Sequence, residues 1–238
     1  AHDDLPDIAT ADYPAYYRRT FHWQSDGWFS ERSAEMYDPG VEFLFGGTAD
    51  VMRRMIIPDV VGATGDVPGA QILDVACGTG RFLSQLRVAL PKARLTGIDL
   101  SPFYTDFAEK ENRGQSIDFE TGNVEAMPYE DSQFDAVTCV FLFHELPKDV
   151  RRIVAREMLR VVKPGGTIAI LDSEQLSTGQ DIGSFLEEFP EIYHEPYYRS
   201  YLRDDLAAMF QSEGLSAIES RSHFTARAVI GRKPMADQ

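Results

Sequence analysis

The stretch LDVACGTGRF (residues 73–82) decides the fold, because it joins a short apolar run to a helical segment through a loop of small residues. Gly78 and Gly80 keep the loop backbone free of Cβ atoms, so a ligand can approach it closely. The following helix offers unpaired N–H groups at its N-terminus, which suit a carboxylate or a phosphate. Such a loop alone is a weak signal, since a tight strand-to-helix turn uses the same residues.

A carboxylate strengthens this signal. The next apolar run, RLTGID (residues 94–99), ends in Asp99. A carboxylate at this point of a βαβ unit can accept hydrogen bonds from both ribose hydroxyls of an adenosine. A helix cap is the other interpretation of Asp99, but Ser101, which precedes Pro102, suits that role better. The loop and the acid together predict a cofactor that contains a nucleoside.

Short apolar runs alternate with amphipathic helical segments from about residue 71 onward, which predicts a mostly parallel sheet. The expected strands cover residues 71–75, 94–99, 116–122, 134–143, 167–172, 215–222 and 224–232. The last two are too close for a crossover connection and must form an antiparallel hairpin. We expect helices after the first, second and fourth strands and over residues 201–213, with a turn at 163–166. The sequence therefore predicts a seven-stranded α/β fold with a C-terminal antiparallel hairpin.

The charge of the chain limits its partners. The formal net charge of the 238 residues is −15, which repels phosphate backbones and anionic lipids. We therefore expect neither nucleic acid nor stable membrane insertion, and no apolar run has transmembrane length. Cys77 and Cys139 lack metal-ligand spacing, so we expect no metal and no disulfide framework. This composition suits a reducing cytoplasm, and a homodimer stays open.

The third glycine of a dinucleotide loop is absent, since Leu83 stands there. The pattern DxAxGxG instead resembles motif I of class I S-adenosylmethionine (SAM)-dependent methyltransferases, with Ala76 in place of the usual first glycine. GIDLSP (97–102), GNVEAMPYEDSQFDAV (122–137) and LRVVKPGG (159–166) resemble that family's acidic motif, its adenine loop and the turn before its fifth strand. The resemblance covers about residues 71–232 and extends to the UbiE-like small-molecule branch.

This resemblance implies a Rossmann-like methyltransferase fold, a SAM-binding core over residues 69–238 and ten residues at the cofactor. They are Asp74, Ala76, Cys77, Gly78, Gly80, Asp99, Leu100, Asn123, Val124 and Phe141. Residues 74–80 would line the amino-acid half of SAM, and Asp99 would bind the ribose. Leu100 and Val124 would enclose the adenine, and Phe141 would lie beside the sulfonium; simple core packing is the alternative for these three. The adenine edge could contact Asn123 or Glu125.

The segment FLFHELP (residues 141–147) supplies a candidate base. His144 follows the fourth strand, at the sheet edge where ligands bind, and imidazole titrates near neutral pH. Its alternative role is to shape the pocket without moving a proton. Glu145 would be a carboxylate at a helix start or a partner of His144.

Aromatic residues are concentrated in residues 1–68, which we expect to form a helical substrate lid, with a lid insertion at about residues 173–198. Tyr16, Tyr37, His144, Tyr193 and Tyr197 are the candidate lid residues, drawn from a larger set that includes Trp23. Such side chains suit a hydrophobic or aromatic acceptor. The alternative is that most of them pack the N-terminal helices against the sheet.

These features favour a methyltransferase for a small molecule, with an oxygen, nitrogen or carbon acceptor left open. Three other interpretations stay open. One is a SAM-binding enzyme of the same fold with different chemistry. A second is an NAD-dependent oxidoreductase, which Leu83 and the terminal hairpin disfavour. The third is a SAM-binding interaction module without enzymatic activity.

Overall fold

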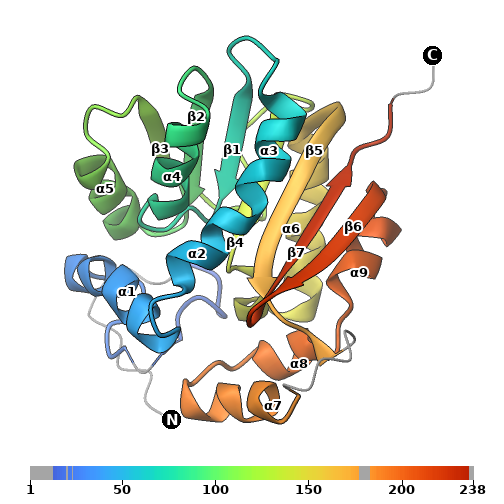
Figure 1. The fold of residues 1–238 in the computed structure, drawn as a ribbon. Helices are drawn as coiled ribbons and strands as arrows, with labels where there is room; N and C mark the ends of the chain where they lie inside the picture. Colours follow the sequence, from blue (N-terminus) through green and yellow to red (C-terminus); the bar gives the residue numbers. More distant parts are fainter. Residues whose placement is uncertain (1–12, 20, 23, 177–182, 236–238) are drawn as a thin grey trace.

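A seven-stranded sheet forms the centre of the molecule in the computed structural model, which describes residues 13–19, 21–22, 24–176 and 183–235 (Figure 1). The strands are β1 (Gln71–Val75), β2 (Arg94–Asp99), β3 (Ile117–Thr121), β4 (Phe134–Val140), β5 (Val162–Ser173), β6 (Ser216–His223) and β7 (Ala226–Arg232). Their order is β3-β2-β1-β4-β5-β7-β6, with β7 antiparallel to both β5 and β6. The predicted mostly parallel sheet with a terminal antiparallel hairpin is confirmed.

Helices connect the strands and cover both faces of the sheet. The α-helices are α1 (Glu31–Leu44), α2 (Ala49–Arg53), α3 (Ile57–Thr64), α4 (Arg81–Ala89), α5 (Pro102–Glu111), α6 (Lys148–Val161), α7 (Gly183–Ile192), α8 (Tyr198–Leu202) and α9 (Leu206–Ser212). Two 3₁₀ turns, η2 (Arg54–Ile56) and η3 (Phe143–Glu145), complete the described elements. None of the helices in the described ranges is long and apolar enough to cross a membrane.

Side chains of successive strand residues enter two separate cores, as the pleat requires. Ile72 and Ala136 pack with α3, α4 and α5 on one face, whereas Leu73 and Val137 pack with α6 and α9 on the other. Every residue from Ala136 to Cys139 is fully buried. The predicted burial of this central strand on both faces is therefore confirmed.

Strand β4 is shorter than predicted. It ends at Val140 because Phe141 has φ = +58°, a left-handed conformation that an extended strand excludes. Residues 143–145, expected to end or follow the strand, form the turn η3 instead. The chain thus bends sharply where the candidate base begins.

Two predicted boundaries near β5 and α9 were wrong. The turn expected at residues 163–166 belongs to β5, where the register with β4 shifts. The helix expected over residues 201–213 is interrupted before α9, because the Asp205 carboxylate accepts the N–H of Ala208 and caps a new helix.

Helices α1, α7 and α8 lie together at one end of the sheet, below the carboxyl ends of the parallel strands in Figure 1. Residues 13–19, 21–22 and 24–29 run along the same end. Open α/β sheets bind ligands outside the carboxyl ends of their strands. Two segments distant in sequence therefore enclose the place where a ligand is expected.

Candidate functional site

The loop after β1 has an unusual backbone. Ala76, Gly78 and Gly80 all have positive φ, of 56°, 55° and 73°. For Ala76 the left-handed conformation costs about 1–2 kcal/mol, because its Cβ approaches the following carbonyl. Such strain is concentrated at ligand sites, where the surroundings enforce it.

Asp99 is held by this loop. Its Oδ2 accepts the N–H of Gly78 at 2.9 Å, and its Oδ1 accepts the N–H of Ser101 at 2.9 Å. Burial raises the pKa of Asp99 to about 6, although these hydrogen bonds oppose the shift. Each oxygen retains a lone pair for a ligand hydroxyl.

Ser101 occupies the N-cap position of α5, as predicted, but its side chain does not cap the helix. The hydroxyl donates instead to the carbonyl oxygen of Trp28 at 2.6 Å. The expectation of a capping side chain was wrong because a tertiary contact to the N-terminal segment takes the hydroxyl.

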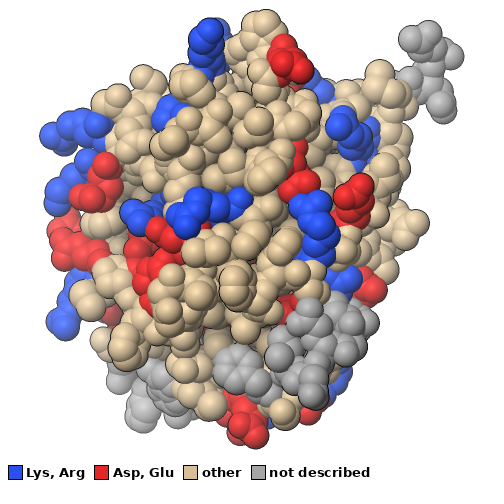
Figure 2. Space-filling model, viewed as in Figure 1, with Lys and Arg blue, Asp and Glu red and all other residues tan. Residues whose placement is uncertain are grey.

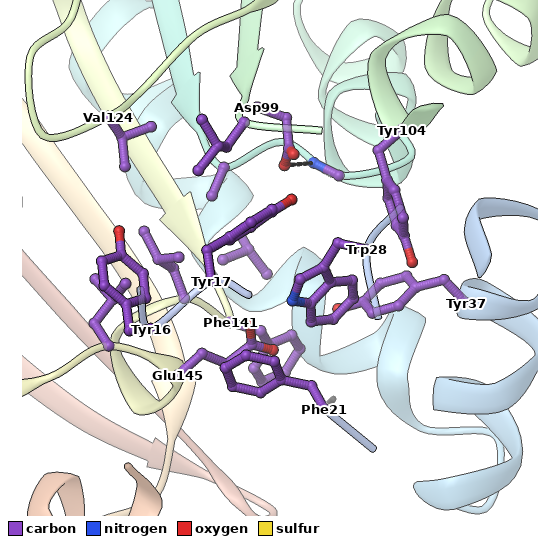
Figure 3. A pocket seen from close by; sticks show the side chains of 16 residues that line it. Tyr16, Tyr17, Phe21, Trp28, Tyr37, Asp99, Tyr104, Val124, Phe141 and Glu145 are labelled. Atoms are coloured by element: carbon purple, nitrogen blue, oxygen red, sulfur yellow. Dashed lines mark hydrogen bonds between the residues drawn. The ribbon is translucent and has the colours of Figure 1, made fainter. Parts of the chain in front are cut away.

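The first cavity opens in front of Asp99 and has an empty volume of about 720 Å³ (Figure 3). Val124 and Asp99 lie along one side of it, and Phe141, Phe21 and Glu145 along the other. The full lining is Tyr16, Tyr17, Phe21, Trp28, Tyr37, Ala76, Gly78, Asp99, Leu100, Tyr104, Val124, Val140, Phe141, Leu142, Glu145 and Leu146. The cavity is mostly apolar, with two carboxylates, Asp99 at the end of β2 and Glu145 in η3.

A smaller extension of this cavity contains opposite charges. Asp74 and Arg53 both line it, and both are buried. Asp74 accepts the hydroxyl of Thr138 at 2.7 Å, and burial raises its pKa to about 7. Arg53 lies 3.0 Å from Asp50 and 3.2 Å from Asp38. This end of the cavity can hold an ammonium and a carboxylate together, as the amino-acid group of SAM requires.

A second cavity, which we call the acceptor cavity, adjoins the first and has an empty volume of about 450 Å³. Tyr37, Phe141 and Glu145 line both cavities. The remaining lining is His22, Val41, Leu44, Phe45, His144, Ser173, Phe189, Glu195, Tyr198 and Thr225. Phe45 stacks on Phe141, with ring centroids 6.0 Å apart. A largely apolar space therefore adjoins the first cavity at Tyr37, Phe141 and Glu145.

His144 lies at the polar end of the acceptor cavity. Its Nδ1 is 2.6 Å from Oδ1 of Asp172, which is also fully buried. Burial lowers the pKa of His144, but the surrounding carboxylates, Asp172 foremost, outweigh it and raise the pKa to about 10. This raised pKa favours the doubly protonated, positively charged imidazolium at neutral pH.

Two residues from outside the sheet complete this polar end. His22 Nε2 is 3.4 Å from Oε1 of Glu145, and His22 Nδ1 is 3.6 Å from Oε1 of Glu195. Glu145, the expected partner of His144, lies farther away than a hydrogen bond allows, with 3.8 Å between His144 Nε2 and Glu145 Oε1. Among the residues that the structure describes, no group of three or more His, Cys, Asp or Glu side chains could hold a metal ion.

Most of the cofactor residues predicted from sequence border the first cavity or its extension. Ala76, Gly78, Asp99, Leu100, Val124 and Phe141 line the main space, and Asp74 and Cys77 line the extension. The predicted lid residues Tyr16, Tyr37 and His144 also border the cavities.

Four predicted residues do not line the cavities. Gly80 packs against Phe119, which an added Cβ would approach to 2.7 Å. Asn123 accepts the N–H of Glu125 at 2.9 Å through its side-chain oxygen. Tyr193 packs on Phe189, and the edge of Tyr197 meets Tyr16. Trp23 and residues 177–182 of the expected lids lie outside the described residues.

Sequence reasoning missed four residues of the site, namely His22, Arg53, Asp172 and Glu195. Tyr198, which belongs to the larger set of aromatic lid candidates, does line the acceptor cavity. Only Asp172 had a usable signal, because it is the polar last residue of the apolar run TIAILD, at the sheet edge. His22 and Glu195 come from segments without periodicity and Arg53 from a short helix, and only the fold brings them to the site.

Known proteins resemble this chain. Residues 72–166 match the model of a family described as "Methyltransferase domain". The ubiquinone/menaquinone biosynthesis C-methyltransferase UbiE of Desulfotalea psychrophila is 34% identical over 146 residues, 57% of this chain and 58% of the relative. The demethylmenaquinone methyltransferase of Deinococcus radiodurans is 36% identical over 111 residues, 46% and 45% of the two chains. The matched stretch spans about half the length of these relatives.

Solved structures share the fold. Human N-acetylserotonin methyltransferase, solved with SAM, superposes with a TM-score of 0.65 over 87% of this chain and 57% of its own, at 15% identity. An O-methyltransferase family protein from Burkholderia thailandensis gives 0.60 over 88% and 64%, at 21% identity. Residues 72–166 therefore match a methyltransferase domain and resemble UbiE-type relatives, and the described residues share the fold of solved methyltransferases.

Proposed function

We propose that this protein transfers a methyl group from SAM to a small hydrophobic or aromatic acceptor. The observation that carries the proposal is that Tyr37, Phe141 and Glu145 line both cavities, so that the two adjoin at these residues. One cavity has the groups that suit an adenosine and an amino acid, and the other is apolar with a polar end. A methyl donor and an acceptor placed in them would meet at this junction.

The residues of the first cavity suit the parts of SAM. Asp99 would accept the ribose hydroxyls, and Leu100 and Val124 would contact the adenine. Arg53 would face the carboxylate of the amino-acid group, and Asp74 its ammonium. SAM supplies a methyl group on an activated leaving group, so the protein's task is mainly alignment. Alignment of this kind can lower a barrier by roughly 7–11 kcal/mol.

The lining of the acceptor cavity favours an apolar acceptor. Phe45, Phe141 and Phe189 supply flat surface, and Val41 and Leu44 are aliphatic. The names of the relatives include quinones and a phthiotriol dimycocerosate lipid, which supports an apolar acceptor for this chain as well. The proposal covers oxygen, nitrogen and carbon acceptors.

His144 would contact the acceptor as a hydrogen-bond donor. Its Nδ1 faces Asp172, so Nε2 is the atom left for a ligand. Because the raised pKa keeps the imidazole protonated at neutral pH, the charged donor form is favoured over the base expected from sequence. His144 could accept a proton from the acceptor only after losing its own.

We also propose that residues 13–68 and the segment of α7 and α8 act as lids. Tyr37 and Phe45 from the first segment, and Phe189 and Glu195 from the second, border the acceptor cavity. An acceptor would have to pass between these segments. Their relative movement would then control entry.

The surface charge favours a small-molecule acceptor over nucleic acid. On the face in Figure 2, basic side chains lie interspersed with acidic ones. The net charge of −15 opposes binding to a phosphate backbone.

Asp99→Asn tests the cofactor site, with Asp118→Asn on the exposed edge of β3 as the matched control. Calorimetry with SAM and S-adenosylhomocysteine should show that Asp99→Asn lowers the affinity by roughly 10- to 100-fold, because one hydrogen bond to a charged group is worth about that much. The control should keep the affinity of the parent protein. Equal affinities in the variants and the parent protein would contradict the ribose assignment.

Incubation with SAM and candidate acceptors, followed by mass spectrometry, should show a product heavier by one CH₂ unit and S-adenosylhomocysteine. A changed product without this gain would favour non-methylating chemistry.

A further inference from the structure

Glu195 closes the polar end of the acceptor cavity. It lies between α7 and α8, outside the matched domain, and only 4% of its surface is exposed. Its Oε2 atom has no hydrogen-bond partner among the described residues. A buried carboxylate oxygen without a partner is costly, and native proteins rarely retain one without a reason.

The groups around Glu195 are too far away to satisfy it. His144 Nε2 is 3.8 Å from its Oε2, and His22 Nδ1 is 3.6 Å from its Oε1. These distances exceed those of hydrogen bonds. The nearby hydroxyl of Tyr198 is already bonded to Ser173 at 2.5 Å. Glu195 borders the acceptor cavity together with both imidazoles, so a ligand donor in that cavity could complete its hydrogen bonding.

The charges of the side chains around Glu195 also favour a ligand that donates a hydrogen bond. The cluster contains three carboxylates, Asp172, Glu145 and Glu195, and two imidazoles, His22 and His144. Even with both imidazoles protonated, one negative charge is in excess. No Lys or Arg is among the described residues that line the acceptor cavity. Burial raises the pKa of Glu195, against the effect of the two histidines, so its charge is not fully compensated by them.

We infer that Glu195 recognises the acceptor by taking a hydrogen bond from it. The acceptor is then an apolar molecule with a hydroxyl or N–H group at the end that enters between His22 and His144. This inference rests on the proposed function, since it names the acceptor class of the same site. Glu195 is a specificity-determining residue, and it is supplied by a segment beyond the family's domain.

Three fluorescent probes of the same ring size test this inference. They are naphthalene, which has no donor, 2-naphthol, which has a hydroxyl, and 2-naphthylamine, which has N–H groups. Affinities are measured by fluorescence titration with and without saturating S-adenosylhomocysteine. The proteins are the parent, Glu195→Gln and the control Glu191→Gln, whose exposed carboxylate on α7 pairs with Arg199.

The parent protein should bind at least one donor probe more tightly than naphthalene. Glu195→Gln should reduce this preference by roughly 10-fold or more, because an ionic hydrogen bond becomes a neutral one. Glu191→Gln should leave it unchanged. The tighter of the two donor probes identifies a hydroxyl or an N–H as the recognised group. If thermal melting shows that Glu195→Gln is unfolded, Glu195→Asp replaces it, and should retain the charge and part of the preference.

Equal binding of the three probes, no binding of any, or a preference that survives in Glu195→Gln overturns the inference. None of these results affects the proposed function while S-adenosylhomocysteine still binds. Loss of S-adenosylhomocysteine binding would instead contradict the cofactor site. The probe titrations done in the absence of S-adenosylhomocysteine would still decide the role of Glu195.

Discussion

The Nδ1 atom of His144 lies 2.6 Å from Oδ1 of Asp172, and both side chains are buried. The other oxygen of Asp172 accepts the N–H groups of Leu142 and Phe143, at 3.1 and 2.7 Å. One carboxylate at the end of β5 thus holds both the turn after β4 and the imidazole that follows it. This ion pair links the stability of the fold to the protonation of the site.

Stability should therefore fall as the pH rises. The folded protein holds the proton of His144 with a pKa of about 10, against 6.5 for an ordinary histidine. The folded state binds more protons in this window, so the contribution of His144 is fully present below pH 6.5 and is lost as the pH rises through about 10. Urea unfolding across this range should show a shallower decline in His144→Gln than in the parent. His223→Gln, on β6, is the control, and equal slopes in all three proteins would refute the assignment.

The strand bounds were predicted best where buried runs end at polar or small residues. β1 and β2 have the bounds expected from QILDV and RLTGID. The end of β4 was missed because the run FDAVTCVFLF stays apolar from Cys139 to Phe143, and only the positive φ of Phe141 stops the strand. An apolar pattern reports burial, and it contains no signal for a backbone bend that surrounding structure imposes.

The site likewise contains residues that could be predicted from the sequence and residues that could not. Asp99 and the loop after β1 could be identified because close backbone approach and ribose binding impose residue types at a fixed spacing. His22 and Glu195 could not, because they are 173 residues apart and meet only through the packing of α7 and α8 beside the N-terminal segment. Cofactor binding was therefore predictable and acceptor recognition was not.

Arg53 should support both the fold and the cofactor site. Arg53→Met removes the cation beside Asp38 and leaves Asp50 paired with Arg81 alone. The loss should cost about 1–2 kcal/mol, less than for a fully buried pair because both acids are partly exposed. If Arg53 pairs with the carboxylate of bound S-adenosylhomocysteine, the affinity for this ligand should fall by roughly 10- to 100-fold in Arg53→Met. Arg54→Met, on the exposed neighbour, is the control for both calorimetry and urea unfolding. A loss of stability with unchanged affinity would leave Arg53 a structural role only.

Gly80 should tolerate no side chain. A Cβ at this position would lie 2.7 Å from Phe119, and its φ of +73° disfavours any L residue. Gly80→Ala should therefore lower the free energy of unfolding by about 2–4 kcal/mol, through both backbone strain and overpacking. Gly114 has φ = +87° but open space around it, so Gly114→Ala should cost only about 1 kcal/mol. Adding Phe119→Leu should recover part of the lost stability in Gly80→Ala but none in Gly114→Ala. Equal losses of stability in the two glycine variants would contradict the packing argument.

Arg151 should affect acceptor binding more than cofactor binding, because it joins the turn η3 to the segment that follows Glu195. The fully buried guanidinium donates to the carbonyl oxygens of Phe143 and Tyr197, at 2.9 and 3.1 Å, and lies 3.3 Å from Asp204. A lysine has one nitrogen and cannot span these partners.

Arg151→Lys should therefore lower the free energy of unfolding by about 2–3 kcal/mol and weaken the binding of 2-naphthol, while the affinity for S-adenosylhomocysteine stays within about 2-fold. Arg152→Lys, whose side chain is 36% exposed and pairs with Glu213, should change none of these quantities. Parallel losses of both ligands in Arg151→Lys would mean that η3 and α8 support the whole site equally. The separate control of the acceptor cavity by this buried cation would then be wrong.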